Sequence, residues 1–125
     1  MKLMIIDSDA ERIEEIRGIF SNYGFDVMVV PGIASKSKIL HSYVRTDPDG
    51  VIIGRTNYKD RMLEKAIRTE NRTMLQPKHL EVSLASGNQD WRSLAKRWTT
   101  IGEAINRKAK YSRGPELPSM EVAYA

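Results

Sequence analysis

Short unbroken apolar runs and longer amphipathic stretches follow one another along the chain. The apolar runs end at turn residues such as Gly24, the Pro31–Gly32 pair and the Asp47–Gly50 stretch. These runs predict strands over 2–7, 25–30, 51–53, 73–75 and 79–85. Between and after them, apolar residues at helical spacing predict helices over 10–23, 34–45, 58–69 and 91–111. Helices that separate parallel strands pack on both faces of a sheet, so the pattern predicts a three-layer αβα domain with a mainly parallel sheet of four or five strands.

The length and composition indicate one domain with a short tail. The 125 residues fit a single α/β domain over 1–111. We expect a flexible tail over 112–125, because that segment lacks a helical apolar stripe and holds Gly114, Pro115 and Pro118. No apolar run approaches the roughly 20 residues of a membrane span, and no signal peptide is visible. We therefore expect a cytoplasmic protein with no membrane partner.

The residue types present exclude several kinds of chemistry. There are no cysteines, which excludes disulfides, thiol catalysis and zinc–thiolate sites. The chain has two histidines, too few for a histidine-rich metal site. Ser, His and Asp all occur, but no pattern arranges them as a catalytic triad.

The first 54 residues carry a recognisable order of motifs. An apolar strand ends in Ile5-Ile6-Asp7-Ser8-Asp9, a helix follows, and Gly24-Phe25-Asp26-Val27 opens the next strand. Pro48-Asp49-Gly50-Val51-Ile52-Ile53-Gly54 then forms the third strand. This order resembles the start of response-regulator receiver domains. The resemblance implies a flavodoxin-like fold with strand order 2-1-3-4(-5), an acidic pair that binds magnesium at the end of the first strand, and an aspartate that accepts a phosphoryl group at the end of the third.

The chain departs from the receiver pattern at the positions that carry its chemistry. Gly54 stands at the phosphoacceptor position, so that position is lost, and Ser8 replaces the second carboxylate of the acidic pair. The family's Thr/Ser-Ala and Lys-Pro motifs are also missing. Aspartyl phosphorylation needs a carboxylate nucleophile and a divalent cation that offsets the phosphoryl charge. We therefore interpret the chain as a degenerate receiver that is not an enzyme.

Asp7 and Asp9 allow two interpretations. Two carboxylates at a strand end could bind Mg²⁺ weakly, and this is the one cofactor the sequence leaves open. Alternatively, Asp9 caps the following helix while Asp7 is solvated. The second interpretation is favoured, because Asp49 is the only other acid expected nearby.

A long C-terminal helix is predicted from a stripe of apolar residues at 3-4 spacing. One continuous helix would pack this stripe on the sheet or on a partner copy. The alternative is a helix-turn-helix over 94–108, in which the capping-box pattern Thr100–Glu103 restarts the helix. The stripe, which is the predicted interaction surface, consists of Trp91, Leu94, Trp98, Ile101 and Ile105.

Basic residues are concentrated in the second half of the chain. Residues 55–113 hold 14 Lys/Arg against 6 Asp/Glu, whereas the whole chain has a net charge of +4. Such a segment either forms a solvated helical surface or binds a polyanion such as nucleic acid. The candidate nucleic-acid contacts are Arg92, Lys96, Arg97, Arg107, Lys108 and Lys110.

The sequence thus predicts a regulatory or adaptor protein that acts through protein–protein contacts in signal transduction or transcription regulation. A homodimer through the C-terminal helix is the expected assembly. The first alternative is a small DNA-binding transcriptional regulator that uses the basic C-terminal half. The second is a small nucleotide- or Mg²⁺-binding enzyme at the strand ends near Asp7, Asp9 and Arg55.

Overall fold

The computed structural model describes residues 1–85 and 89–112, with side chains up to residue 105. Strands and helices alternate along this part of the chain, as predicted for an α/β protein. The elements, in chain order, are β1 (Lys2–Asp7), α1 (Ala10–Asn22), β2 (Asp26–Pro31), α2 (Lys36–Thr46), β3 (Gly50–Ile53), α3 (Asp60–Thr73), β4 (Glu81–Leu84) and α4 (Trp91–Ser112).

The four strands form one parallel sheet in the order β2-β1-β3-β4. This order agrees with the predicted 2-1-3-4 and is compatible with a flavodoxin-like fold. β1 and β3 are the inner strands, and all residues from Leu3 to Asp7 and from Gly50 to Ile53 are buried. Because the strands are parallel, their carboxyl ends meet at one edge of the sheet.

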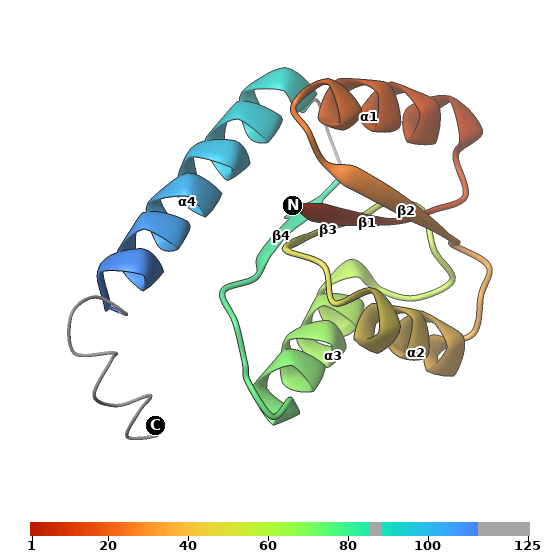
Figure 1. Cartoon of the computed structure of the whole chain (residues 1–125). Helices are drawn as coiled ribbons and strands as arrows, with labels where there is room; N and C mark the ends of the chain where they lie inside the picture. Colours follow the sequence, from red (N-terminus) through yellow and green to blue (C-terminus); the bar gives the residue numbers. More distant parts are fainter. Residues whose placement is uncertain (86–88, 113–125) are drawn as a thin grey trace.

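Two helices lie on each face of the sheet, an arrangement consistent with three αβα layers (Figure 1). Helices α1 and α4 cover one face, where Leu3, Ile5 and Ile52 pack against Phe20 and Trp98. Helices α2 and α3 cover the other, where alternate strand residues meet a second apolar cluster. That cluster includes Met4, Ile6, Ile53, Ile39, Tyr43, Leu63 and Ile67.

Local sequence signals explain where the first two helices begin and end. The side chain of Asp9 accepts a hydrogen bond from Arg12 N and caps α1, and Ser35 caps α2 through Lys38 N. Gly24 has φ +87° just after α1, a conformation that glycine adopts without a steric penalty. Asp47 ends α2 in the left-handed region, which Asp tolerates better than most residues.

The strand predicted at 73–75 is wrong. Helix α3 continues through Thr73, and Leu75 is almost fully exposed at 99%. The amide side chain of Asn71 donates to Lys78 O at 2.7 Å and accepts from Lys78 N at 3.3 Å. These two hydrogen bonds satisfy the backbone N–H and C=O groups of Lys78, in the segment between α3 and β4, without a partner strand. The apolar pair Met74–Leu75 in that segment therefore does not need to form a strand.

The segment predicted as a fifth strand, 79–85, is the fourth strand, β4. The expected tail falls on residues 113–125, which lie outside the described part of the chain. Within residues 1–85 and 89–112, no helix combines the length and the hydrophobicity needed to cross a membrane.

Candidate functional site

The carboxyl ends of β1 and β3 bring Asp7 and Gly54 together. Ile6 pairs with Ile53 in the sheet, and Gly54 N donates to Ile6 O at 2.8 Å. Catalytic groups and ligands of open α/β sheets are found at this edge. This corner, formed by Asp7, Arg12, Gly54 and Arg55, is therefore the first place to look for function.

The Asp7 carboxylate is held by an arginine of the helix that follows it. Asp7 is only 1% exposed. Arg12 donates from Nε to Asp7 Oδ2 at 2.6 Å and from Nη2 to Asp7 Oδ1 at 2.9 Å. Two parallel hydrogen bonds of this kind form the strongest geometry available to a guanidinium–carboxylate pair.

Two backbone amides complete the surroundings of Asp7. The N–H groups of Asp9 and Arg55 both donate to Asp7 Oδ1 at 2.9 Å. Burial alone would raise the pKa of Asp7, but the hydrogen bonds from Arg12 and from the two amides outweigh burial and leave the pKa below its ordinary value of 3.8. Asp7 is therefore a charged group at neutral pH, although it is shielded from water. The expectation of a solvated Asp7 is wrong, because the Arg12 side chain and the Arg55 loop enclose the carboxylate.

Gly54 has a packing role directly after β3. A Cβ atom on Gly54 would overlap both carboxylate oxygens of Asp7. The space of a side chain at residue 54 is thus already filled by Asp7. A Cβ atom on Gly32, in the loop after β2, would likewise overlap Arg55 O and Ser8 Oγ.

The two carboxylates predicted for magnesium both face Arg12. Asp9 caps α1 and lies 3.8 Å from Arg12 Nη1, while Asp7 makes the bidentate pair. Asp49, the third acid expected nearby, lies at the opposite end of the sheet, where it accepts from Lys2 N at 2.8 Å. No group of three metal-binding side chains occurs in the described residues. These residues do not fit a magnesium ion, because a guanidinium already supplies the positive charge beside Asp7.

Arg12 is the residue of this corner that sequence reasoning missed. A signal was present, because Arg12 lies in the first turn of α1, where the helix dipole disfavours a positive charge. The pairing with Asp7 offsets that cost. The same pairing raises the pKa of Arg12, chiefly through the hydrogen bond to Asp7.

The apolar stripe of α4 is placed mainly on the sheet. Trp91, Leu94 and Trp98 are at most 6% exposed, and the Trp98 ring lies on Gly50 and 5.8 Å from the ring of Phe20. Farther along, Ile101 is half-buried and Ile105 is 39% exposed. Only the second half of the predicted interaction surface is thus accessible on the described chain.

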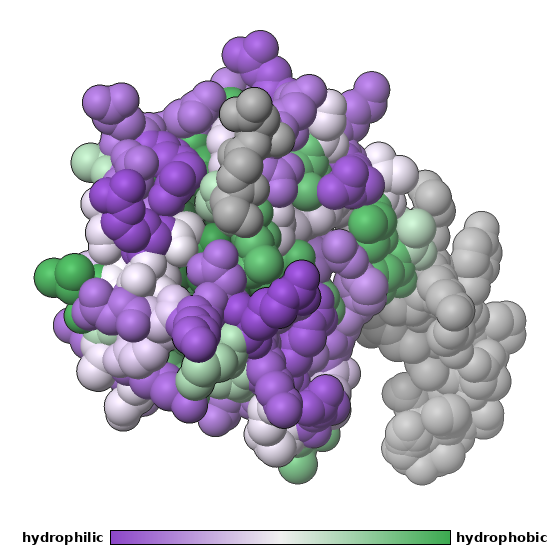
Figure 2. Space-filling model, turned by 180° about the vertical axis from the view of Figure 1, so that it is seen from behind, coloured by the Kyte–Doolittle hydropathy of each residue, from purple (hydrophilic) through white to green (hydrophobic). Residues whose placement is uncertain are grey.

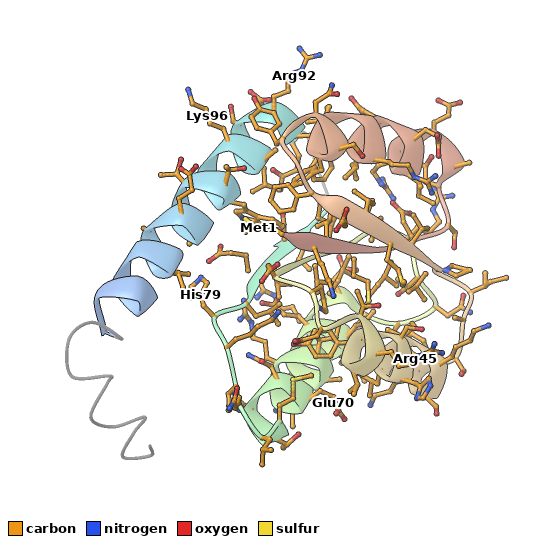
Figure 3. The ribbon with its side chains drawn as sticks, viewed as in Figure 1. Met1, Arg45, Glu70, His79, Arg92 and Lys96 are labelled. Atoms are coloured by element: carbon orange, nitrogen blue, oxygen red, sulfur yellow. The ribbon has the colours of Figure 1, made fainter. Side chains whose placement is uncertain are left out.

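The basic residues at the start of α4 lie on its outer face. Arg92, Lys96 and Arg97 are exposed, and Figure 3 shows Arg92 and Lys96 pointing away from the sheet. Residues 94–108 are helical throughout, without the turn that a helix-turn-helix requires. The side chains of Arg107, Lys108 and Lys110 lie outside the described part of the structure.

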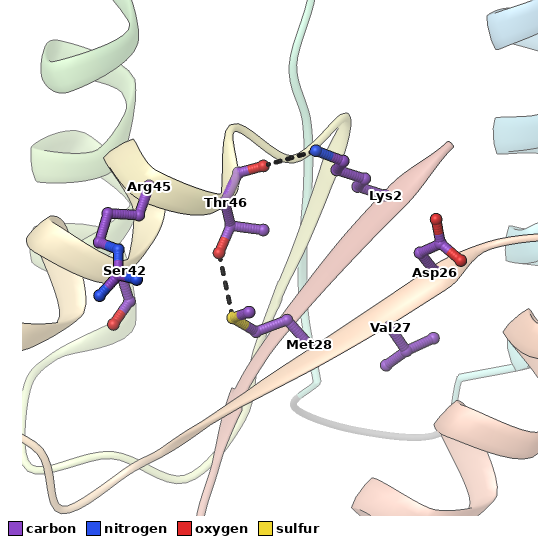
Figure 4. Close-up of a pocket in the computed structure, with 7 residues that line it drawn as sticks. All are labelled: Lys2, Asp26, Val27, Met28, Ser42, Arg45 and Thr46. Atoms are coloured by element: carbon purple, nitrogen blue, oxygen red, sulfur yellow. Dashed lines mark hydrogen bonds between the residues drawn. The ribbon is translucent and has the colours of Figure 1, made fainter.

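A groove of about 410 Å³ lies beside β2, at the edge of the sheet that this strand forms (Figure 4). The Thr46 hydroxyl donates to Met28 Sδ at 3.0 Å across its floor. Sequence reasoning did not find this groove, since exposed Met28 was indistinguishable from a core methionine. It is lined by Lys2, Asp26, Val27, Met28, Ser42, Arg45 and Thr46.

Figure 2 shows one face of the molecule, which is largely hydrophilic with hydrophobic side chains gathered near its centre.

In comparisons with known proteins, the chain matches no protein-family model and no curated protein sequence. Over residues 1–85 and 89–112, the chain forms a small α/β domain with a parallel four-stranded sheet and four helices.

Proposed function

We propose that this chain is a non-catalytic regulatory or adaptor protein of the cytoplasm, built on a degenerate receiver-like scaffold with a long C-terminal helix. It acts through contacts with other proteins. One observation carries the proposal: the Asp7–Arg12 pair fills the corner above Gly54 where a receiver would hold a phosphoryl group.

The chemistry of that corner supports a loss of phosphoryl transfer. An attacking carboxylate must present a free oxygen, and a cation must offset the charge of the phosphoryl group. Here Asp7 Oδ1 accepts three hydrogen bonds and Asp7 Oδ2 accepts one from Arg12. The carboxylate is neutralised within the protein, and the protein gains a fixed junction between β1, α1 and the loop after β3.

Incubation with acetyl phosphate and Mg²⁺, followed by intact mass measurement, tests this proposal. We expect no mass gain, and we expect Mg²⁺ to leave the melting temperature unchanged. The proposal fails if the wild-type protein gains one phosphoryl group and Asp7→Asn does not. Stabilisation of the wild-type protein by Mg²⁺, absent from Asp7→Asn, would likewise contradict it.

DNA binding is a second candidate, supported by the exposed Arg92, Lys96 and Arg97 on the outer face of α4. Contacts with phosphates weaken steeply as salt is added. A DNA shift assay at several salt concentrations should then show binding that Arg92→Ala/Lys96→Ala weakens. The matched control is Arg17→Ala/Lys36→Ala, which removes the same charge from exposed positions on α1 and α2. Absence of salt-sensitive binding, or equal losses in both variants, rules out this use of α4.

A further inference from the structure

β2 is an edge strand with an open side. It pairs only with β1, and no other strand of the described chain lies beside it. With six residues it is longer than β4, the strand at the other edge. An edge strand with unpaired backbone N–H and C=O groups is a surface to which another strand can pair.

The hydrogen bonds to β1 identify which backbone groups of β2 are available. Asp26 N donates to Met1 O at 2.8 Å, and Gly32 N donates to Asp7 O at 3.1 Å. Even-numbered residues of β2 therefore face β1, and the N–H and C=O groups of Val27 and Val29 point to the open side.

Phe25 and Pro31, which flank the two valines in the same alternation, offer no further N–H donors on the open side of β2. Phe25 N is used by α1, where it donates to Phe20 O at 3.1 Å. Pro31 has no N–H group, and its C=O accepts a hydrogen bond from Ala34 N at 3.0 Å. Within β2, the open edge thus presents two donors and two acceptors, all on Val27 and Val29.

The opposite edge is better protected. β4 has four residues, and the Gln89 side chain donates to Leu84 O at 3.2 Å. On β2, by contrast, Met28 is 44% exposed and lies between the two valines with free backbone groups. The two edges therefore differ in both length and covering.

We propose that two copies of this chain pair antiparallel through β2, about a two-fold axis at Met28. In this register, Val27 of each copy lies opposite Val29 of the other. The four open groups of one strand then meet the four of its copy, and the two sheets become one of eight strands. Isologous pairing of this kind needs a self-complementary surface, which an edge with only Val27 and Val29 open provides.

The side chains fit the same register. Met28 and its copy become directly opposite residues that share no hydrogen bond, whose Cα atoms are about 4.5 Å apart. Asp26 of one copy lies opposite Val30 of the other, near the start of α2. Lys38 is exposed there and precedes Ser42 and Arg45 by one and two helical turns on the stripe that lines the groove. In the proposed register, Asp26 of one copy therefore approaches the first turn of α2 of the other, which carries Lys38, twice by symmetry.

The inference does not depend on the proposed adaptor function, since it concerns assembly alone. Sedimentation analysis of the full chain over a wide concentration range should show a dimer of twice 14.2 kDa. Met28→Lys places two like charges at the axis and should raise the dissociation constant about tenfold or more. Ile105→Lys, which makes the same addition of charge on exposed α4, should leave the dissociation constant unchanged.

Two further variants test the register. Val29→Pro removes one outward donor from each copy and should abolish the dimer, while circular dichroism shows that the fold is retained, because this amide is not used within the sheet. Asp26→Lys should weaken the dimer, and Asp26→Lys/Lys38→Asp should restore it.

Three outcomes overturn the proposal. The first is a monomer at every concentration, which is also the result if the edge receives a strand from a different protein. The second is a dimer that Ile105→Lys disrupts and Met28→Lys does not, which would place the interface on α4. The third is a dimer that Val29→Pro leaves intact although the variant is folded.

Discussion

Arg12 and Asp7 form a partly buried ion pair, and the two side chains differ in their access to water. Asp7 has no route to water, whereas the Arg12 side chain is 25% exposed. Removing Arg12 would leave a buried carboxylate with two amide donors and no counter-charge. The loss should therefore reflect the unpaired charge more than the value of the bond itself.

Arg12→Ala should lower the free energy of unfolding at pH 7 by about 3 kcal/mol. Urea denaturation followed by circular dichroism measures this change. Arg17→Ala is the control, since Arg17 and Glu14 form an exposed pair at 3.7 Å that contributes little. A loss for Arg12→Ala no larger than that of the control would show that the pair does not hold the corner together.

The same carboxylate predicts a pH dependence. The folded-state pKa of Asp7 lies below its ordinary value of 3.8, so its stabilising contribution is present above 3.8 and is lost as the pH falls through the folded-state pKa. The difference in unfolding free energy between wild type and Asp7→Asn should be largest near neutral pH and shrink in acid. A difference that is constant from pH 7 to pH 3 would contradict this assignment.

Tyr43 carries a hydroxyl that has no hydrogen-bond partner among the described residues. Burial, aided by the charges of Asp47 and Glu70, raises the pKa of Tyr43 to about 12. Tyr43→Phe removes the unsatisfied group and should stabilise the protein by about 1 kcal/mol in thermal or urea unfolding. The wild type should also lose stability as the pH rises from 10 towards 12, and the part due to Tyr43 should be missing in the variant. A destabilised Tyr43→Phe would indicate a hydrogen bond to this hydroxyl.

The packing of helix α4 on the sheet depends chiefly on the contact between Trp98 and Gly50. The six-membered ring of Trp98 packs against Gly50, a residue of β3 whose missing side chain makes room for the ring. Trp98→Ala should cost about 3–5 kcal/mol in unfolding free energy. Arg97→Ala, one residue earlier and exposed, should stay within about 0.5 kcal/mol. Equal effects of the two substitutions would mean that α4 is not part of the core.

The elements show which sequence signals decide secondary structure here. Runs such as Val51–Ile53 contain no polar residue and were predicted correctly as strands. The run Thr73–Leu75 looked similar, but Asn71, two residues earlier, clasps Lys78 and keeps the segment out of the sheet. A contact between a side chain and a backbone seven residues away has no periodic signature, so pattern reasoning could not find it.

The same strands contribute side chains to the apolar layers on both faces of the sheet. Leu3 and Ile5 point to the α1–α4 layer, and Met4 and Ile6 point to the α2–α3 layer. Loss of either layer would expose one side of β1, so both layers should unfold together.

This coupling predicts the behaviour of a substitution on the far face. Both tryptophans of the chain, Trp91 and Trp98, belong to the α1–α4 layer. Ile67→Ala, in the other layer, should lower stability by about 2–5 kcal/mol and shift the transitions seen by tryptophan fluorescence and by circular dichroism equally. Thr69→Ala, on the exposed side of the same helix, is the control. Two separate transitions in Ile67→Ala would show that the layers are independent.

For the molecule as a whole, the sequence predicted the α/β class and the order of the strands. It did not predict that the Asp7 carboxylate fills the space beside Gly54, or that Arg12 pairs with that carboxylate. In the sequence, Asp7 and Arg12 are ordinary charged residues near the start of a helix. Their roles emerge only once β1, α1 and β3 are brought together.

The amide of Arg55 offers a way to watch that corner directly. Its proton is bonded to the Asp7 carboxylate, which is buried and comes from a residue 48 positions earlier. Hydrogen–deuterium exchange at Arg55 therefore requires the segment after β3 to move away from the end of β1, whereas exposed loop amides exchange through small local motions. A single backbone proton can thus report how often this buried junction opens in the native protein.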